Sequence, residues 1–80
     1  MKQLTIQYFA LFREQAGTSE ESITTSAETP AALYAELRER HPFRLPAEQL
    51  KVAVNAEFAD WATPLRDGDI VVFIPPVAGG

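Results

Sequence analysis

Apolar and polar residues alternate at the start of the chain, and this alternation predicts a strand. Leu4, Ile6 and Tyr8 are separated by polar residues, which is the pattern of a strand with one buried face. Residues 21–25 repeat the pattern more weakly, with Ile23 pointing inward. We therefore predict that the two segments pair as a hairpin whose long connection is partly helical.

After Thr29 the period changes from that of a strand to that of a helix. Thr29 is a good N-cap residue, and Pro30 suits the first helical position because that position needs no amide hydrogen. Apolar residues follow at the spacing of one buried helix face, at Leu33, Tyr34 and Leu37. Pro42 predicts the end of the helix, since a proline disfavours helical angles in the residue before it.

The second half of the chain contains three shorter apolar segments. Residues 51–55 and 57–61 predict two short strands, and the β-branched and aromatic run Ile70–Ile74 predicts a buried central strand. Two strands, a helix, short strands and a final apolar strand follow one another in the order of the ubiquitin-like β-grasp fold. The predicted fold class is therefore α+β, with a mixed sheet packed on one main helix.

The last predicted strand is apolar on both faces, so its orientation must be inferred. The residues predicted to face the helix are Ile70, Val72 and Ile74. Val71 and Phe73 then lie on the opposite face, where an exposed apolar patch marks a partner-binding surface. The alternative is that residues 56–64, with Trp61, cover this patch.

Composition and charge argue against several classes of function. Eighty residues allow one small domain, and a net charge of −4 argues against nucleic acid, which calls for clustered Lys and Arg. No apolar run approaches the ~20 residues of a membrane span and no signal peptide is recognisable, so we expect a cytoplasmic protein without a membrane partner. The chain has no cysteine and one histidine, His41, so we predict neither a metal site nor a cysteine nucleophile.

The chain ends in two prolines, two small residues and two glycines. Pro75 and Pro76 cannot donate to a β-ladder, so the chain must leave the sheet there. We predict a β-grasp domain over residues 1–76 and a flexible tail over residues 77–80. The tail could be an ordinary frayed terminus, but Gly-Gly directly after a proline pair and a buried strand favours a functional interpretation.

A tail without large side chains can enter a narrow channel. Ala78, Gly79 and Gly80 suit a chain that passes its own α-carboxylate into the active site of another protein. Adenylation by ATP turns a carboxylate into a mixed anhydride, which a sulfur nucleophile can convert into a thiocarboxylate. The sequence therefore favours a sulfur carried at the chain end.

Both ends of the chain resemble one family. Residues 73–80, Phe-Ile-Pro-Pro-Val-Ala-Gly-Gly, resemble the Phe-Phe-Pro-Pro-Val-x-Gly-Gly ending of the small subunit of molybdopterin synthase, a ubiquitin-like sulfur carrier. Residues 9–17, Phe-Ala-Leu-Phe-Arg-Glu-Gln-Ala-Gly, are similar to the Phe-x-x-x-Arg-Glu-x-x-Gly segment of that family. Ile74 stands where the family often has Phe, and it keeps the position apolar.

The resemblance implies a chemistry carried by Gly80 rather than by side chains. An E1-like adenylyltransferase would activate Gly80, and a sulfur-donating enzyme would convert it into a thiocarboxylate. The tail would insert into the large subunit and donate sulfur to a cyclic pyranopterin precursor, which forms the molybdopterin dithiolene. The residues assigned to insertion are Pro75, Pro76, Val77, Ala78 and Gly79.

The same resemblance implies an enzyme only in the sense of a sulfur-donor subunit. The chain lacks a glycine-rich phosphate loop, so we expect it to bind no cofactor and ATP to bind the activating enzyme. Arg13 is a candidate partner contact, with a local ion pair to Glu14 as the alternative. Two other functions stay open, a sulfur carrier for thiamine thiazole synthesis and a ubiquitin-like modifier joined to lysines through Gly80.

Overall fold

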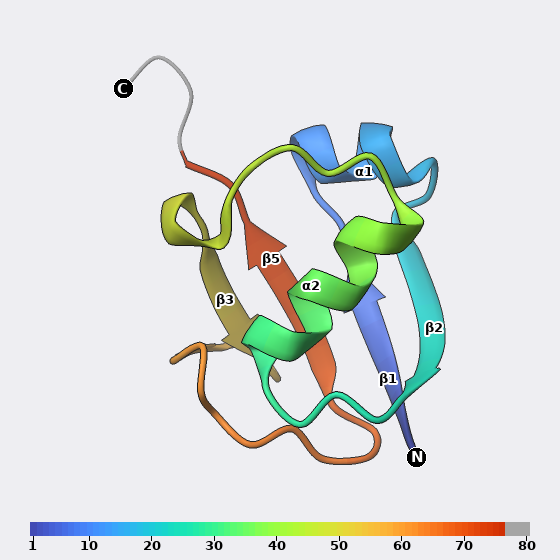
Figure 1. The fold of residues 1–80 in the computed structure, drawn as a ribbon, viewed down its shortest axis with the longest axis vertical. Helices are drawn as coiled ribbons and strands as arrows, with labels where there is room; N and C mark the ends of the chain where they lie inside the picture. Colours follow the sequence, from blue (N-terminus) through green and yellow to red (C-terminus); the bar gives the residue numbers. More distant parts are fainter. Residues whose placement is uncertain (77–80) are drawn as a thin grey trace.

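A five-stranded mixed sheet forms one layer of the protein, and the helix α2 lies across one of its faces (Figure 1). The computed structural model describes residues 1–76. The strands are β1 (Lys2–Gln7), β2 (Glu20–Thr25), β3 (Lys51–Val54), β4 (Glu57–Ala59) and β5 (Ile70–Ile74). The helices are α1 (Ala10–Ala16), α2 (Pro30–Arg40) and a single 3-10 turn, Ala47–Gln49. This arrangement confirms the predicted α+β fold class.

The strand order is β2-β1-β5-β3-β4, which places β5 at the centre of the sheet. β1 and β5 run parallel, whereas the other neighbouring strands run antiparallel. The predicted hairpin of β1 and β2 is confirmed, and α1 lies in its connection. The parallel pair brings the end of β5 to the same end of the sheet as α1, opposite the chain's N-terminus (Figure 1).

The helix α2 has the boundaries and the buried face that its sequence predicts. Thr29 caps it, since the backbone N–H of Ala32 donates to Thr29 Oγ1 at 3.2 Å. Pro30 occupies the first turn, and the helix ends at Arg40, before Pro42. Its buried residues are Pro30, Leu33, Tyr34 and Leu37.

The predicted orientation of β5 is wrong. Val71 is fully buried and Phe73 is 1% exposed, because their side chains face α2 and join the core. The ring of Phe73 lies 5.1 Å from that of Tyr34 and stacks on that of Trp61 at 5.8 Å, measured between centroids. The alternative prediction, that Trp61 and its neighbours cover this part of β5, is thus partly right. Trp61 does cover Phe73, but on the helix side of the sheet.

Val71 and Phe73 therefore do not form the partner-binding surface that the sequence predicted. Val71 pairs with Ile6, a residue of the buried face of β1, so the parallel register forces Val71 to the same side. A side chain with no exposed area has nothing to offer a partner unless the domain opens. The residues predicted to face the helix, Ile70, Val72 and Ile74, point instead to the opposite face, which we call the outer face.

The start of β5 is fixed by a polar network at the other end of the sheet. The Asn55 side chain donates from Nδ2 to Asp69 Oδ1 at 2.9 Å and accepts from the backbone N–H of Ile70 at 2.9 Å. Asp69 Oδ2 accepts from the backbone N–H of Arg66 at 2.8 Å. These bonds hold the turn into β5, so the strand enters the sheet in one register.

Candidate functional site at the end of strand β5

The candidate site begins where β5 leaves the sheet. Ile74, the last residue of the strand, pairs with Lys51 of β3. Pro75 is half-buried and Pro76 is exposed, and neither has an N–H to continue the ladder. The remaining residues predicted for the tail, Val77, Ala78, Gly79 and Gly80, lie outside the described residues.

A groove between α1 and the proline pair flanks this exit on one side. Its volume is about 560 Å³, and it is lined by Ala10, Leu11, Arg13, Glu14, Leu45, Pro75 and Pro76. Leu11 is 39% exposed and Arg13 is exposed. Two segments of the chain resemble the sulfur-carrier family, one in α1 and one that contains the proline pair. The groove shows that these two segments lie side by side. Arg13 stands where a partner seated on the exit could reach it.

A second groove flanks the exit on the side of the outer face. Its volume is about 340 Å³, and it is lined by Gln49, Lys51, Phe58, Ile74, Pro75 and Pro76. The Lys51 ammonium nitrogen lies 5.7 Å from the centroid of the Phe58 ring, within the range of a cation–π contact. Sequence reasoning missed this groove, because it depends on the pairing of β3 with both β4 and β5.

The outer face carries the apolar surface that the sequence assigned to the wrong residues. Ile70 is 39% exposed and Phe58 is 74% exposed, while Val72 and Ile74 are partly exposed. Ala53 joins them, since it pairs with both Val72 and Phe58. The outer patch, which we define as Ile70, Val72, Ile74, Ala53 and Phe58, continues into the second groove at Ile74 and Phe58. It thus leads to the exit of the tail.

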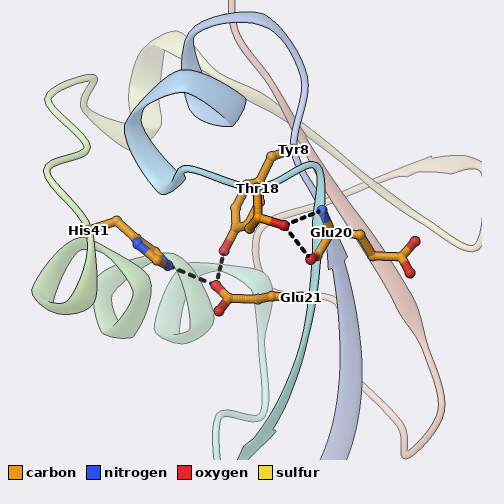
Figure 2. Close-up of polar contacts among 5 residues, drawn as sticks. All are labelled: Tyr8, Thr18, Glu20, Glu21 and His41. Atoms are coloured by element: carbon orange, nitrogen blue, oxygen red, sulfur yellow. Dashed lines mark hydrogen bonds and ion pairs between the residues drawn. The ribbon is translucent and has the colours of Figure 1, made fainter.

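Three polar side chains meet on the helix side of the sheet, at the end of α2 (Figure 2). The Tyr8 hydroxyl donates to Glu21 Oε1 at 2.5 Å, and His41 Nε2 lies 2.7 Å from the same oxygen. Glu21 points to this side because it pairs with Ile6 of the buried face. We call these three residues the Tyr8–Glu21–His41 clasp, since they join the residue after β1, the strand β2 and the residue after α2.

The charge of Glu21 is stabilised by the clasp. Partial burial raises the pKa of Glu21, but the hydrogen bonds from Tyr8 and His41, together with the positive charge of Arg40, outweigh it and lower the pKa overall. Burial and the hydrogen bond to Glu21 raise the pKa of Tyr8, so its hydroxyl stays protonated and remains a donor. Glu21 is therefore an ionised acceptor held by two donors.

The sequence did not reveal the clasp. The single histidine served only as an argument against a metal site, and nothing in the sequence indicates that its ring contacts Glu21, which is 20 residues away. Next to the clasp, Thr18 Oγ1 donates to the backbone oxygen of Glu20 at 2.9 Å, which tightens the turn into β2 (Figure 2).

No metal centre is found in residues 1–76, where no three His, Cys, Asp or Glu side chains are grouped to hold an ion. Neither helix of this part of the chain has the length and apolarity needed to cross a membrane. What the structure offers at the candidate site is therefore a chain exit between two grooves and an apolar patch.

Comparison with known proteins assigns the chain to a family. A model of the ThiS family matches residues 6–80, which include both segments singled out from the sequence. The chain belongs to the ThiS family. The matched range includes the proline pair and the two terminal glycines.

Two curated relatives in this family are named "Molybdopterin synthase sulfur carrier subunit". The protein from Escherichia coli is 35% identical over 80 residues, which cover 96% of this chain and 99% of that protein. The protein from Mycobacterium tuberculosis is 35% identical over 83 aligned positions, which cover all of both chains. The similarity therefore extends from end to end.

Solved structures agree with this assignment. The putative molybdopterin converting factor subunit 1 from Pyrococcus furiosus is 30% identical, with a TM-score of 0.78 over 96% of this chain and all of that one. A complex of subunits 1 and 2 of the molybdopterin-converting factor from Helicobacter pylori contains a chain that is 26% identical, with a TM-score of 0.69 over 98% of this chain and 99% of that one. A small archaeal modifier protein from H. volcanii shares the fold at 22% identity, with a TM-score of 0.81 over 96% of this chain and all of that one. That last likeness shows the fold alone.

Proposed function

We propose that this chain is the sulfur-carrier small subunit of a molybdopterin synthase. The observation that carries the proposal is its end-to-end similarity to two sulfur carrier subunits of that enzyme. The geometry supports it, because the central strand β5 leads to a proline pair that borders two grooves. The chain then acts as an enzyme only together with its large subunit.

The chemistry is proposed to take place at the Gly80 carboxyl. The carboxylate attacks the α-phosphate of ATP on an E1-like adenylyltransferase, and pyrophosphate leaves. Sulfide-level sulfur from a sulfur-donating enzyme then attacks the carbonyl carbon, AMP leaves, and a thiocarboxylate remains. In the large subunit the thiocarboxylate sulfur bonds to a carbon of the cyclic pyranopterin precursor in place of an oxygen, and water hydrolyses the resulting thioester, which leaves the sulfur on the pterin and restores the Gly80 carboxylate. Two such transfers build the dithiolene.

The outer patch is the proposed docking surface for these partners. An exposed Phe58 beside the exit and an exposed Ile70 at the start of β5 give an apolar area that a partner can bury while it receives the terminus. Arg13, across the exit, is the proposed polar contact at the edge of the α1 groove. A guanidinium there would pair with a carboxylate of the partner and fix the orientation of docking.

The absence of bulk at the terminus fits delivery through a channel. Gly79 and Gly80 have no side chains, so a partner must hold them through main-chain hydrogen bonds and through the terminal carboxylate. A substitution such as Gly79→Val should block insertion without affecting the domain, because Gly79 follows the last strand by several residues.

Intact mass spectrometry tests the proposal. The chain is incubated with ATP, an E1-like enzyme and a sulfur donor, and one oxygen should be replaced by one sulfur. Adding the large subunit and the pterin precursor should return the mass to that of the carboxylate. A chain with Gly80 deleted should melt at the same temperature and acquire no sulfur, and an adduct on that truncated chain would refute the mechanism.

The same experiment separates the two other functions. A thiazole carrier would form the thiocarboxylate but keep it in the presence of the pterin precursor and large subunit. A protein modifier would appear as an isopeptide on lysines of other proteins. The likeness to an archaeal modifier shows the fold alone, so neither alternative is favoured over the first.

A further inference from the structure

The strand β2 forms an open edge of the sheet. In the part of the chain that the structure describes it pairs only with β1, and Figure 1 shows it at the margin of the sheet. The backbone N–H of Tyr8 donates to the backbone oxygen of Ser19 at 2.9 Å, which continues the ladder between the two strands. Because bonded residues alternate along an antiparallel strand, Glu20, Ser22 and Thr24 direct their backbone N–H and C=O groups away from β1. Such an edge can pair with another strand.

Thr18 closes one end of this edge. Its hydroxyl donates to the backbone oxygen of Glu20 at 2.9 Å and accepts from the backbone N–H of the same residue at 3.4 Å (Figure 2). Both outward backbone groups of Glu20 are thus engaged within the chain. The outward N–H and C=O groups of Ser22 and Thr24 stay open, since no turn, loop or side chain of the described residues binds them.

These open groups are complementary to themselves. In an antiparallel pair with a second copy of β2, a twofold axis at Ile23 sets Ser22 of each copy opposite Thr24 of the other. Opposite residues of this kind exchange two hydrogen bonds, so every open group of both copies is satisfied. A shift of the axis by one residue would set an open residue either opposite Glu20, which Thr18 occupies, or beyond the end of β2. The edge therefore specifies one register.

The same register brings opposite charges together on the helix side of the sheet. It sets Glu21, which contacts His41 at the end of α2, opposite Thr25 of the second copy. Thr25 donates to Glu36 Oε1 at 3.0 Å, whereas Glu36 Oε2 is buried and has no hydrogen-bond partner among the described residues. Across the axis, the Glu36 carboxylate therefore approaches the end of α2 of the second copy, which carries Arg40 and His41.

We propose that two copies of this chain pair through β2 and form a dimer with one continuous sheet. A second copy fits better than an extended segment of another protein, because the open backbone groups, the closed end and the charges all match under one axis. The two carboxylates of β2 stand opposite Ser26 and Thr25 of the second copy, so like charges do not meet. Since β1 separates β2 from β5, the chain exits and outer patches of both copies stay accessible.

Sedimentation equilibrium of the full chain tests the dimer. Interfaces well below 1,200 Å² are weak, so we expect a dissociation constant of about 0.1–1 mM. The average mass should rise toward that of a dimer between about 20 µM and 2 mM. Thr24→Pro removes an outward N–H and leaves the ladder with β1 intact, so association should weaken about tenfold or more. A wild-type chain that stays monomeric at about 2 mM would overturn the proposal.

Cysteine substitutions test the register, because the chain has no cysteine of its own. Position 22 of one copy and position 24 of the other should have their Cα atoms about 5.5 Å apart, which a disulfide spans. Two copies of the same position should be about 7–8 Å apart, which is beyond that range. An oxidised mixture of Ser22→Cys and Thr24→Cys chains should thus form the mixed disulfide in about tenfold excess over either self-linked product.

Thr18→Val is the matched variant for the closed end. It frees Glu20, so a twofold axis at Ser22 becomes possible, and Ser22→Cys chains that also carry Thr18→Val should link to themselves. Random proportions of the three disulfides in the first mixture, or no gain of self-linked product with Thr18→Val, would overturn the proposed register. Neither measurement involves Gly80, so a failure here leaves the proposed function to its own test.

Discussion

The two faces of the sheet carry side chains of the same kinds in different surroundings. Phe73 on the inner face is 1% exposed and packs between Tyr34 and Trp61, whereas Phe58 on the outer face is 74% exposed. The carboxylates of Glu21 and Glu20 differ in the same way. The Glu21 carboxylate accepts two hydrogen bonds on the helix side of the sheet, whereas the Glu20 carboxylate accepts one, from Gln7 Nε2 at 3.3 Å, on the outer face. Residue type alone therefore does not separate the side chains that hold this fold from those available to a partner.

Phe73→Ala and Phe58→Ala are the sharpest test of this difference. Truncating a buried Phe removes core contacts and leaves a cavity, so Phe73→Ala should lower the free energy of unfolding by about 3–5 kcal/mol. Phe58→Ala should change it by less than about 0.5 kcal/mol, as is usual for an exposed side chain. Urea titrations followed by circular dichroism measure both variants. Equal losses from the two variants would contradict the assignment of the faces.

The fold class and the boundaries of α2 could be predicted from sequence because their signals are local. Thr29 and Pro30 mark the start of the helix, and four apolar residues at helical spacing mark its buried face. The orientation of β5 could not be predicted this way. A period of two divides a strand into two sets of residues, but when both sets are apolar it does not say which set faces the core. The pairing of Val71 with Ile6 decides it.

The candidate site likewise has one part that could be predicted from the sequence and another that could not. The proline pair and the glycines are contiguous, so the sequence was enough to single out the chain ending. The two grooves and the clasp bring together residues that are far apart, such as Arg13 with Pro76 and Glu21 with His41. Their positions depend on strand register and on the path of the loop after α2, neither of which has a local sequence signal.

Substitutions of exposed apolar residues on the outer face should weaken binding to the large subunit and leave the free energy of unfolding unchanged. Phe58 and Ile74 are the proposed anchors beside the exit, and truncating such an anchor weakens binding by about 2 kcal/mol, or roughly 30-fold. We expect that loss for Phe58→Ala in calorimetric titrations with the large subunit. Ser22→Ala, on the polar part of the same face, is the matched control and should bind as the wild type does. If both variants bind normally, the docking surface lies elsewhere.

Glu21 on the inner face and Glu20 on the outer face should differ in how they affect the pH dependence of the free energy of unfolding. A hydrogen bond to a charged group contributes about 1.5 kcal/mol or more, so Glu21→Gln should lose about that much at pH 7, and Glu20→Gln almost nothing. The folded-state pKa of Glu21 is lowered, so its contribution is complete above the ordinary value of 4.5 and is lost as pH falls through the folded value.

The difference in unfolding free energy between wild type and Glu21→Gln should therefore shrink as the pH is lowered below about 4.5. Denaturant titrations at several pH values measure it, with Glu20→Gln as the control. A difference that stays constant with pH would mean that the ionised carboxylate of Glu21 is not what the clasp stabilises.

Pro76→Gly should give the smallest effect, and it acts on the exit rather than on either face. Proline fixes one backbone angle, which limits the directions in which the chain can continue before a partner binds. Glycine widens that choice, so binding must order more conformations, and we expect a loss of about 0.4–1 kcal/mol, or roughly two- to fivefold in affinity. The unfolding free energy should not change, since Pro76 is exposed and lies beyond the last ladder bond of β5. Calorimetry with the large subunit should show that the loss of affinity is entropic. The affinity of Pro76→Ala should lie between those of the wild type and Pro76→Gly. A loss as large as that of Phe58→Ala would instead mean that the Pro76 ring is itself buried by the partner.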